Sequence, residues 1–516
     1  MTWRHFLLLA LLGLLVSLFF AYFEPFPGYL DSDYYFGGGL QLAQGRGFTE
    51  PYVWNYLDDP QSLPQPSHSY WMPLASIVAA AGLVVTGQTT YAAGRLGFLV
   101  FAMLAPVTTA ALAYNFSKRR DLAFASGLLA VFSIYYAPFI PVSDNYGIYI
   151  TLGGLYFLLC TNHRPHTYLF LGLIAGLLTL ARSDGLLWIG LTVLLILWRF
   201  ISERKLGAAF INLALALLGF LIIMGPWFWR NEQLYGALLA PGGSYLLWLK
   251  NYDETFAFPA SQLTLGSWLA QGWQAILAVR WDALRNNLLN AFAAQGGIFL
   301  FPFILIGLWQ YRRDQRIQFA SLAWLALLFV MTVVFPFAGP RGSFFHSGAA
   351  LQSLWWTLAP LGLDSAIGFV RRHGGLNSQA FPVFRIALVG IAILMTGVIF
   401  YIRVLQPGWD EDQQIYPKVE AVLQQNGVVP GDVVIVRNPP GYYLMTGRSA
   451  IVIPYGDENS LLSAAKRFHA RFVAIEAAGA SGPVGVIYND KSDPFLRFLG
   501  EVNEPNNVTR IFEIQP

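Results

Sequence analysis

Charged residues are scarce in this sequence. They make up 12% of its 516 residues, whereas soluble domains carry about a quarter. Hydrophobic residues make up 55%, and apolar runs of about 17–25 residues, the length that spans a bilayer, recur to about residue 404 and then stop. This pattern excludes an ordinary soluble protein and predicts membrane-spanning helices followed by one soluble domain.

Cysteine and net charge are also nearly absent. The single Cys160 excludes intramolecular disulfides and cysteine-based metal sites. The formal net charge of +3 gives no electrostatic support to a nucleic-acid partner. The first apolar run follows Arg4 and His5 as in a signal peptide, but no small-x-small cleavage site precedes Glu24. We therefore interpret this run as a retained first helix.

The apolar runs predict about eleven transmembrane helices. The predicted spans are 5–23, 92–116, 120–140, 146–162, 167–183, 185–201, 207–229, 288–310, 317–337, 344–369 and 382–404. Lys and Arg cluster at alternate gaps, namely Arg4, 118–120, Arg164, 204–205, 312–316 and 371–372. Basic loops of this kind lie in the cytoplasm, so the pattern predicts which connections face outward.

This topology requires that the apolar segment 70–86 does not cross the membrane. We predict a re-entrant or juxtamembrane helix there. The chain is then a multi-pass protein of the plasma (inner) membrane with a cytoplasmic N-terminus. Its outer face carries a first loop at 24–91, a short loop around 143–145, a large loop at 230–287, a loop at 338–346 and the C-terminal region.

The C-terminal region has a different pattern. Apolar, β-branched runs at 433–436, 451–453 and 472–475 predict buried strands, and stretches near 413–426 and 458–469 predict helices. This alternation predicts a small extracytoplasmic α/β domain over 405–516, separate from the membrane domain over 1–404. Because it contains neither G-x-G-x-x-G nor a P-loop, nucleotide binding is not expected. We interpret it as a packing or acceptor-docking module.

Two acidic residues open the first outer loop. Asp31 and Asp33 lie in the stretch PGYLDSDYY, directly after the first span. Two carboxylates beside a low-dielectric surface can have their pKa values pushed apart or can hold a divalent cation. Either arrangement suits a general base acting on a hydroxyl or an amine. The alternative is that Asp31 caps a short helix starting at Ser32.

The motif Asp-x-x-Tyr-Tyr at 31–35, followed by Gly-x-Gly-Phe at 45–48, resembles the first outer loop of the GT-C superfamily of membrane glycosyltransferases. Within it the likeness is to the protein O-mannosyltransferase and aminoarabinose-transferase-like branch. The resemblance covers 5–235 well, and 290–404 only as a pattern of spans. It implies a polytopic all-α membrane protein with juxtamembrane helices in the first outer loop, and it makes 1–404 the catalytic domain.

The resemblance also implies the catalytic residues. The family's acidic residue maps onto Asp31, because Tyr34 lies three positions on, and Asp33 is the competing assignment. Asp144, after two prolines, resembles the second acidic site. It can instead be the N-cap of the helix that begins near Tyr146.

Candidate partners of the donor phosphate follow from the same resemblance. His68, in the segment PSHSYWMPL, matches the family's basic residue near the lipid phosphate or a metal, or it is an amphipathic anchor. Four further residues match later motifs: Arg182, Arg230, Arg341 and His346. Arg forks suit phosphate oxygens, but Arg230 and Arg341 can also snorkel to headgroups. Arg182 can simply pair with Asp184. The last loop departs from the family, which often has Arg-Tyr where this chain has Arg341-Gly342.

Together these matches imply an inverting glycosyltransferase that moves a sugar from a polyprenyl-phosphate carrier to an outer-face acceptor. Asp31 would be the general base. The sugar stays open, as does the acceptor, which can be a protein, a glycan or a lipid. The need for a divalent metal also stays open, with Asp31, Asp144 and His68 as candidate ligands. The alternative hypothesis is a polytopic transporter or lipid flippase. Transporters tend to have internal repeats, and none is evident in this sequence. A non-catalytic scaffold would leave the acidic loop unexplained.

Overall fold

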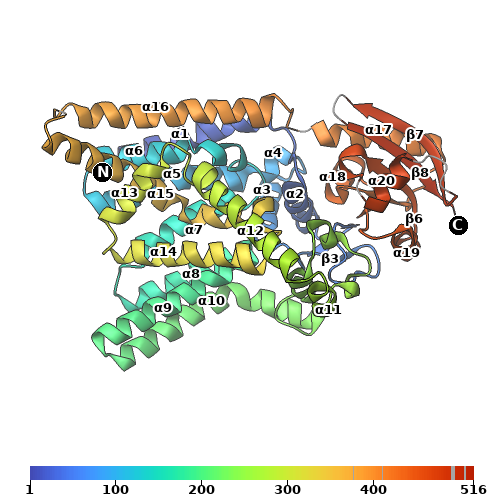
Figure 1. Ribbon diagram of the computed structural model, residues 1–516, viewed down its shortest axis with the longest axis horizontal. Coiled ribbons are helices and arrows are strands. Elements are labelled where there is room, and N and C mark those ends of the chain that lie inside the picture. Colours follow the sequence, from blue (N-terminus) through green and yellow to red (C-terminus); the bar gives the residue numbers. More distant parts are fainter. Residues whose placement is uncertain (376, 410, 481, 490–493, 505–506, 516) are drawn as a thin grey trace.

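The computed structural model has a helical bundle with a small α/β unit at one end (Figure 1). It describes residues 1–375, 377–409, 411–480, 482–489, 494–504 and 507–515. The helices before the α/β unit are α1 (Trp3–Phe23), α2 (Leu30–Ala43), α3 (Leu74–Thr86), α4 (Tyr91–Gly94), α5 (Leu96–Ser117), α6 (Arg120–Val131), α7 (Tyr146–Leu159), α8 (Pro165–Ala181), α9 (Leu186–Glu203), α10 (Leu206–Tyr235), α11 (Leu265–Leu269), α12 (Trp273–Asn290), α13 (Phe301–Gln310), α14 (Gln315–Phe329), α15 (Phe344–Arg372) and α16 (Ala380–Phe400).

Each of the eleven predicted spans contains helix, but the helices differ in length. In the described part of the chain, six are long and apolar enough to cross a membrane: Trp3–Phe23, Tyr91–Ser117, Ser183–Glu203, Leu206–Tyr235, Gln315–Val334 and Ala380–Leu405. The helices α3, α7, α8 and α13 are apolar but shorter. The predicted span 288–310 is interrupted between a π-helical turn at Ala291–Gln295 and α13. Six spans are therefore supported by length, and the count of eleven stays a prediction.

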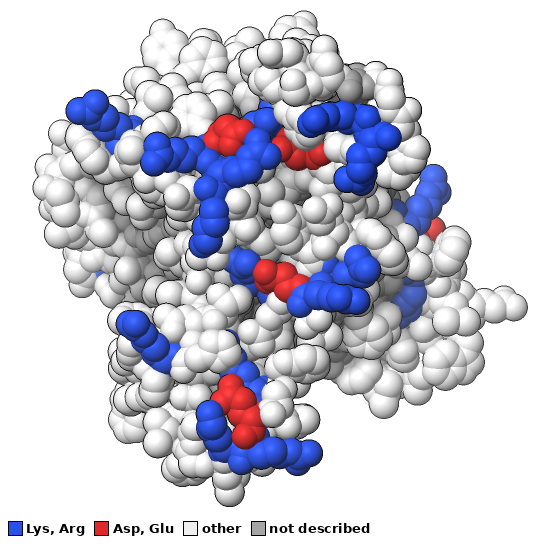
Figure 2. All heavy atoms as spheres, turned by 90° about the vertical axis from the view of Figure 1, so that its left-hand side faces the viewer, with Lys and Arg blue, Asp and Glu red and all other residues white. Residues whose placement is uncertain are grey.

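Basic side chains gather at the end of the bundle that lies away from the α/β unit (Figure 2). We call this the basic end. Its exposed Lys and Arg residues lie on the connections α5–α6, α9–α10, α13–α14 and α15–α16 and include 118–120, 204–205, 312–313 and 371–372. The clusters that the sequence assigned to the cytoplasm therefore share one end of the molecule.

The helix α3 lies alongside α2 instead of running toward the basic end. At its start, the Ser76 hydroxyl donates to the Tyr35 carbonyl of α2 at 2.9 Å. Toward its end, Leu83 packs in a small cluster with Phe36 of α2 and Tyr91 at the start of α4. Both ends of this 13-residue helix therefore touch α2. That it is re-entrant or juxtamembrane stays a prediction.

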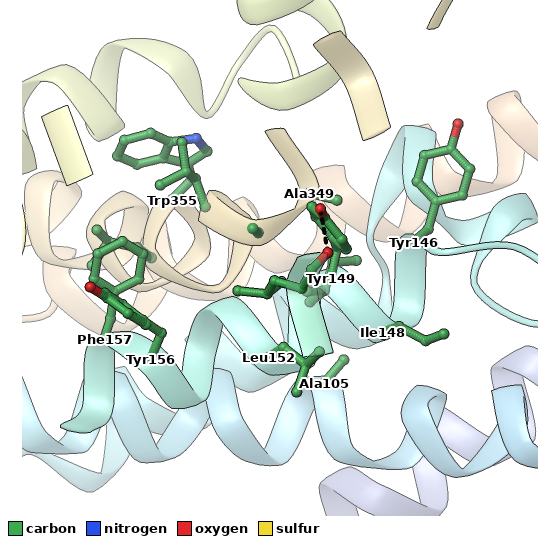
Figure 3. Packing of buried hydrophobic residues seen from close by; sticks show 14 of the residues in the cluster. Ala105, Tyr146, Ile148, Tyr149, Leu152, Tyr156, Phe157, Ala349 and Trp355 are labelled. Carbon is green, nitrogen blue, oxygen red and sulfur yellow. Dashed lines mark hydrogen bonds between the residues drawn. The ribbon is translucent and has the colours of Figure 1, made fainter. Parts of the chain in front are cut away.

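The core forms where α7 packs between α5 and α15. Figure 3 shows Tyr149 and Leu152 of α7 near Ala105 of α5 and Ala349 of α15. The crossing of α7 and α15 is close, because a Cβ on Gly153 would lie 1.8 Å from the Ala350 carbonyl oxygen. Only glycine permits this approach. The crossing holds the beginnings of α7 and α15, where the candidate site lies, in a fixed relation.

The α/β unit is built on a six-stranded sheet with the order β2-β5-β4-β6-β8-β7. Its elements are β2 (Tyr52–Val53), α17 (Glu411–Gln425), β4 (Val433–Val436), α18 (Pro439–Thr446), β5 (Ala450–Val452), α19 (Glu458–Phe468), β6 (Ala470–Glu476), α20 (Gly482–Asn489), β7 (Leu496–Glu504) and β8 (Asn507–Ile514). A second, two-stranded sheet pairs β1 (Thr49–Glu50) with β3 (Gln65–Pro66). The three predicted strands and two predicted helices are present as β4, β5, β6, α17 and α19. The sequence did not predict the other elements.

One edge strand of the sheet comes from the first outer loop. Strand β2 pairs in parallel with β5, with Tyr52 opposite Ala450 and Val53 opposite Ile451. Nearby, the Tyr56 hydroxyl donates to the Val452 carbonyl at 2.5 Å. The first loop and the C-terminal unit therefore form one structure rather than two separate pieces.

Candidate active site

Two acidic residues from different segments meet one histidine from a third segment. His346 Nε2 lies 3.1 Å from Asp144 Oδ2 and 3.9 Å from Asp31 Oδ2. One ligand atom from each residue lies within 4.8 Å of the other two. Asp144 and His346 are buried, and the Asp31 side chain is 27% exposed, so the cluster is open mainly at Asp31. The sequence singled out all three residues but placed His346 with the donor phosphate.

The two acids sit at the beginnings of helices. Asp31 is the second residue of α2, whose N-cap is Tyr29, so the predicted capping role of Asp31 is wrong. Asp144 precedes Asn145, the N-cap of α7. Its Oδ1 accepts the Asn145 backbone N–H at 2.6 Å, while Oδ2 accepts from the Tyr29 hydroxyl at 2.6 Å. The alternative that Asp144 is the N-cap of α7 is therefore wrong, and one of its oxygens lies beside His346.

A turn before α15 fixes the histidine ring. Gly342 has a φ of 115°, a value that favours glycine, and its carbonyl oxygen lies 3.0 Å from His346 Nδ1. A carbonyl oxygen only accepts, so Nδ1 carries a proton. Nε2 then faces the two carboxylates. This donor set, two carboxylates and an imidazole whose far nitrogen is held by a carbonyl, fits a divalent ion.

The environment separates the pKa values of the two acids. Burial and then the negative charge of Asp144 raise the pKa of Asp31 to about 6. Burial also acts to raise the pKa of Asp144, but the His346 charge and hydrogen bonds from His346 and Tyr29 outweigh it and lower this pKa. Asp144 therefore stays ionised, and Asp31 can exchange a proton near neutral pH.

Two arginines lie around this cluster. Arg182 Nε donates to Asp184 Oδ1 at 3.1 Å, which is the pairing that the sequence indicated as the alternative to phosphate binding. Its charge also lowers the pKa of Asp31 against the effect of burial. Its partner Asp184 accepts from Ser347, the residue after His346. Arg341 stacks on the Tyr252 ring at 4.4 Å. Burial and then the charge of Asp31 raise the pKa of that tyrosine, and the charge of Arg341 opposes the rise.

Asp33 points away from the cluster and toward the C-terminal unit. Its Oδ2 accepts from Asn438 Nδ2 at 2.8 Å, and its Oδ1 accepts from Gln413 Nε2. Asn438 also caps α18, because its Oδ1 accepts the Gly441 N–H at 3.1 Å. The side chain of Asp33 is fully buried. This placement makes it an anchor between α2 and the C-terminal unit.

His68 and Arg230 lie together but apart from the acids. His68 Nδ1 lies 2.7 Å from Ser67 Oγ, and Nε2 lies 2.9 Å from Ser76 Oγ. Burial and then the charge of Arg230 lower the pKa of His68 to about 3, so its ring is neutral. Arg230 donates to the Ser67 carbonyl at 2.7 Å and stacks on Trp227 at 4.4 Å. In this arrangement the two residues join α10 to the first loop. The sequence placed His68 near the lipid phosphate or a metal, whereas the histidine that lies beside the two acids is His346.

Two tyrosines of the site were not predicted. Tyr29 donates to Asp144, and the Tyr146 ring stacks on His346 at 4.1 Å with its hydroxyl 3.1 Å from Nδ1. Each lies two positions from a predicted acid: Tyr29 precedes Asp31, and Tyr146 follows Asp144. Proximity in sequence to an acidic residue was the one signal available for them.

Comparison with known proteins gives a likeness in fold. The sequence matches no protein-family model and no curated protein sequence. Among solved structures, the chain is similar to the Archaeoglobus fulgidus oligosaccharyltransferase tethered to an acceptor peptide, with TM-score 0.58, 14% identity and coverage of 94% of this chain and 70% of that one. The same enzyme in complex with zinc and sulfate gives TM-score 0.55, 12% identity and coverage of 91% and 67%.

A second similar structure is ArnT from Cupriavidus metallidurans bound to undecaprenyl phosphate. It gives TM-score 0.54 at 13% identity, and the match covers 98% of this chain and 97% of that one. The oligosaccharyltransferase and ArnT are both glycosyltransferases of the GT-C superfamily. This chain shares their fold, which confirms the likeness that the first-loop motif indicated.

Proposed function

We propose that this chain, which has the GT-C glycosyltransferase fold, is a membrane glycosyltransferase that takes its sugar from a polyprenyl-phosphate carrier. The observation that carries the proposal is the meeting of Asp31, Asp144 and His346 from three separate segments. ArnT, whose fold this chain shares over nearly its whole length, binds undecaprenyl phosphate. A carrier lipid of that class suits a site made from outer-loop residues next to apolar helices.

In this mechanism Asp31 is the general base. It takes the proton of the acceptor hydroxyl or amine as the sugar moves from the phosphate to the acceptor with inversion. Asp144, which accepts from Tyr29, stays ionised and, with the Gly342 carbonyl, keeps the His346 ring in place. Arg182 and Arg341 are the cations placed to offset the charge that grows on the leaving phosphate. The acceptor approaches from the side opposite the basic end.

Asp31, Asp144 and His346 are also the residues that would hold a divalent ion. Such an ion, when bound, supplies positive charge that stabilises phosphate oxygens. Zinc is present in one structure of the similar oligosaccharyltransferase. Of the three metal ligands considered from the sequence, Asp31 and Asp144 are kept, and His346 replaces His68.

The test uses the full-length protein in nanodiscs with a panel of undecaprenyl-phosphate sugars, each supplied together with protein, glycan and lipid acceptors to receive the sugar. Release of free polyprenyl phosphate is measured by mass spectrometry. We expect release from at least one donor, and a loss of about 10²–10⁴-fold in Asp31→Asn. Repeating the assay with a chelator measures metal dependence. Release at the wild-type rate in Asp31→Asn would remove Asp31 as the base. No release from any donor would overturn the carrier class.

A further inference from the structure

A cavity of about 310 Å³ lies between α8, α9 and α10 at the basic end, far from the acidic cluster. Its lining includes His163, Tyr168, Arg199, Glu203, Lys205 and Asn212. In Figure 1 these three helices form the lower left part of the bundle, and Figure 2 shows charged side chains of both signs over that end. The cavity is thus at the level where membrane helices end and headgroups begin.

One buried hydrogen-bond donor in the lining is unused. The Arg199 side chain is only 7% exposed. Its Nη1 donates to the Asn162 carbonyl at 3.1 Å and to the Tyr168 hydroxyl, and its Nη2 donates to the Cys160 carbonyl at 2.8 Å and to Gln315 at 3.4 Å. Its Nε–H has no partner among the described residues. A buried guanidinium N–H without an acceptor is costly, so a ligand acceptor would stabilise it.

One buried acceptor in the same lining is also unused. Within the described chain, Asn212 Oδ1 receives no hydrogen bond although it is shielded from solvent. At the mouth, Glu203 lies 3.2 Å from Lys205 Nζ and 3.8 Å from His163 Nδ1. The wall of the cavity therefore contains a donor and an acceptor that have no partner among the described residues, both just beneath its surface, and its mouth carries both signs of charge. A simple anion satisfies only half of these groups.

The surroundings are apolar and face outward. Ile201 of α9 is 62% exposed, and Leu206 and Phe210 of α10 are 70% and 72% exposed. Side chains of this kind on a membrane protein contact acyl chains. A ligand that enters between these helices therefore has a polar part that fits the cavity and apolar tails that lie along the helices. Basic pockets between helices on one side of a membrane bind lipid headgroups in this way.

We propose that this cavity binds the headgroup of an ethanolamine phospholipid from the leaflet at the basic end. The lipid phosphate accepts from Arg199 Nε and Lys205. The ammonium group donates to Asn212 Oδ1 and faces Glu203. The ethanolamine headgroup carries both an anion and N–H donors, whereas choline lacks the N–H donors and glycerol lacks the cation. The proposal does not depend on the sugar-transfer activity.

The test uses the full-length protein in nanodiscs of phosphatidylcholine with a minor fraction of phosphatidylethanolamine or phosphatidylglycerol. Native mass spectrometry measures retained lipid, and thermal unfolding measures stability. We expect phosphatidylethanolamine to be retained about tenfold more than either other lipid, the ratio given by one hydrogen bond to a charged group. The unfolding temperature should rise with it. Equal retention of phosphatidylglycerol, or equal retention of phosphatidylcholine, would overturn the proposal.

Variants locate the site. Lys205→Ala with Asn212→Leu should abolish the preference, while Arg204→Asn, which removes a neighbouring exposed charge outside the lining, should keep it. Asn tolerates the positive φ of 55° at position 204. If the double variant does not fold, Asn212→Asp, which retains an acceptor, should keep the preference, and its loss there would count against the assignment. Equal protection by free phosphoethanolamine at the same concentration would overturn the lipid as the source of the headgroup.

Discussion

Asp31 and Asp144 are chemically identical side chains that the fold places in opposite states. Asp144 is tied by Tyr29, His346 and a backbone N–H, whereas Asp31 has the more open position. Two titratable groups whose pKa values are driven apart in this way are the usual basis for dividing charge stabilisation from proton transfer.

The pKa of Asp31 sets a pH dependence for the proposed reaction. A general base acts only when it is deprotonated, so activity should fall below a pH of about 6 and level off above about 7. The decline should approach tenfold per pH unit at low pH. A pH–rate profile of polyprenyl phosphate release checks this, with unfolding measured over the same range. A flat profile from pH 5 to 8 would contradict the assignment of Asp31.

Asp33→Asn should act mainly on stability. Asp33 accepts from two amide N–H groups, and an asparagine would direct its own N–H groups at one of them. We expect a loss of about 1–3 kcal/mol in the free energy of unfolding, as for an unsatisfied buried donor. Thermal unfolding in detergent measures this, with Asp31→Asn as the matched control that should lose activity instead. Wild-type stability with lost activity in Asp33→Asn would make Asp33 the base.

The sequence predicted both acids of the motif but not their division of labour. What distinguishes Asp33 is its contact with Gln413 and Asn438, which lie 380 and 405 positions away. His346 was assigned to the phosphate for the same reason, since its contact with Asp144 spans 202 positions. The local sequence pattern shows which acidic and basic residues lie beside a membrane span. Which of them contact one another depends on tertiary packing.

At the scale of elements, the site depends on how α7 crosses α15. The N-terminal ends of these two helices bring Asp144 and His346 together, and the close contact at Gly153 sets the distance between them. The sequence predicted both helices as spans at 146–162 and 344–369. It did not predict that they touch, because an apolar helix surface does not show in the sequence which other helix it packs against. Strand β2, with two residues, is too short to give an alternating pattern.

Gly153→Ala should separate the two helices. The added Cβ would lie 1.8 Å from the Ala350 carbonyl oxygen, so the backbone must shift. We expect a loss of about 1–3 kcal/mol in stability, as for overpacked cores, together with reduced activity because Asp144 and His346 move apart. Gly190→Ala on α9 is the control, since its Cβ meets nothing within 4 Å. Unchanged unfolding temperature and activity in Gly153→Ala would show that the crossing does not control the site.

At the scale of the whole molecule, the basic end and the α/β unit lie at opposite ends of the bundle (Figure 1). The positive-inside rule then puts the α/β unit and the acidic cluster on the extracytoplasmic side. This orientation stays a prediction from charge.

A reporter that is active only in the cytoplasm should be silent when it is fused to the C-terminus. A cysteine at Gln88, in the connection after α3, should be labelled from the outside, and the only native cysteine, Cys160, is buried and should not interfere. A reporter fused in the 204–205 connection is the control and should be active. An active C-terminal reporter would reverse the orientation and move the reaction to the cytoplasmic face.

The pairing of β2 with β5 has a consequence for how the protein is made. Val53 leaves the ribosome about 400 residues before its partner Ile451, which at about 5–20 residues per second is a delay of roughly 20–80 s. Through that interval the first loop has no sheet to join and Asp33 has no Asn438 to bind. Until then the helix that carries Asp31 is held by α3 but not by the C-terminal unit. For the function proposed above, the helix of the general base therefore gains its second support only after Gln413 and Asn438 have been made.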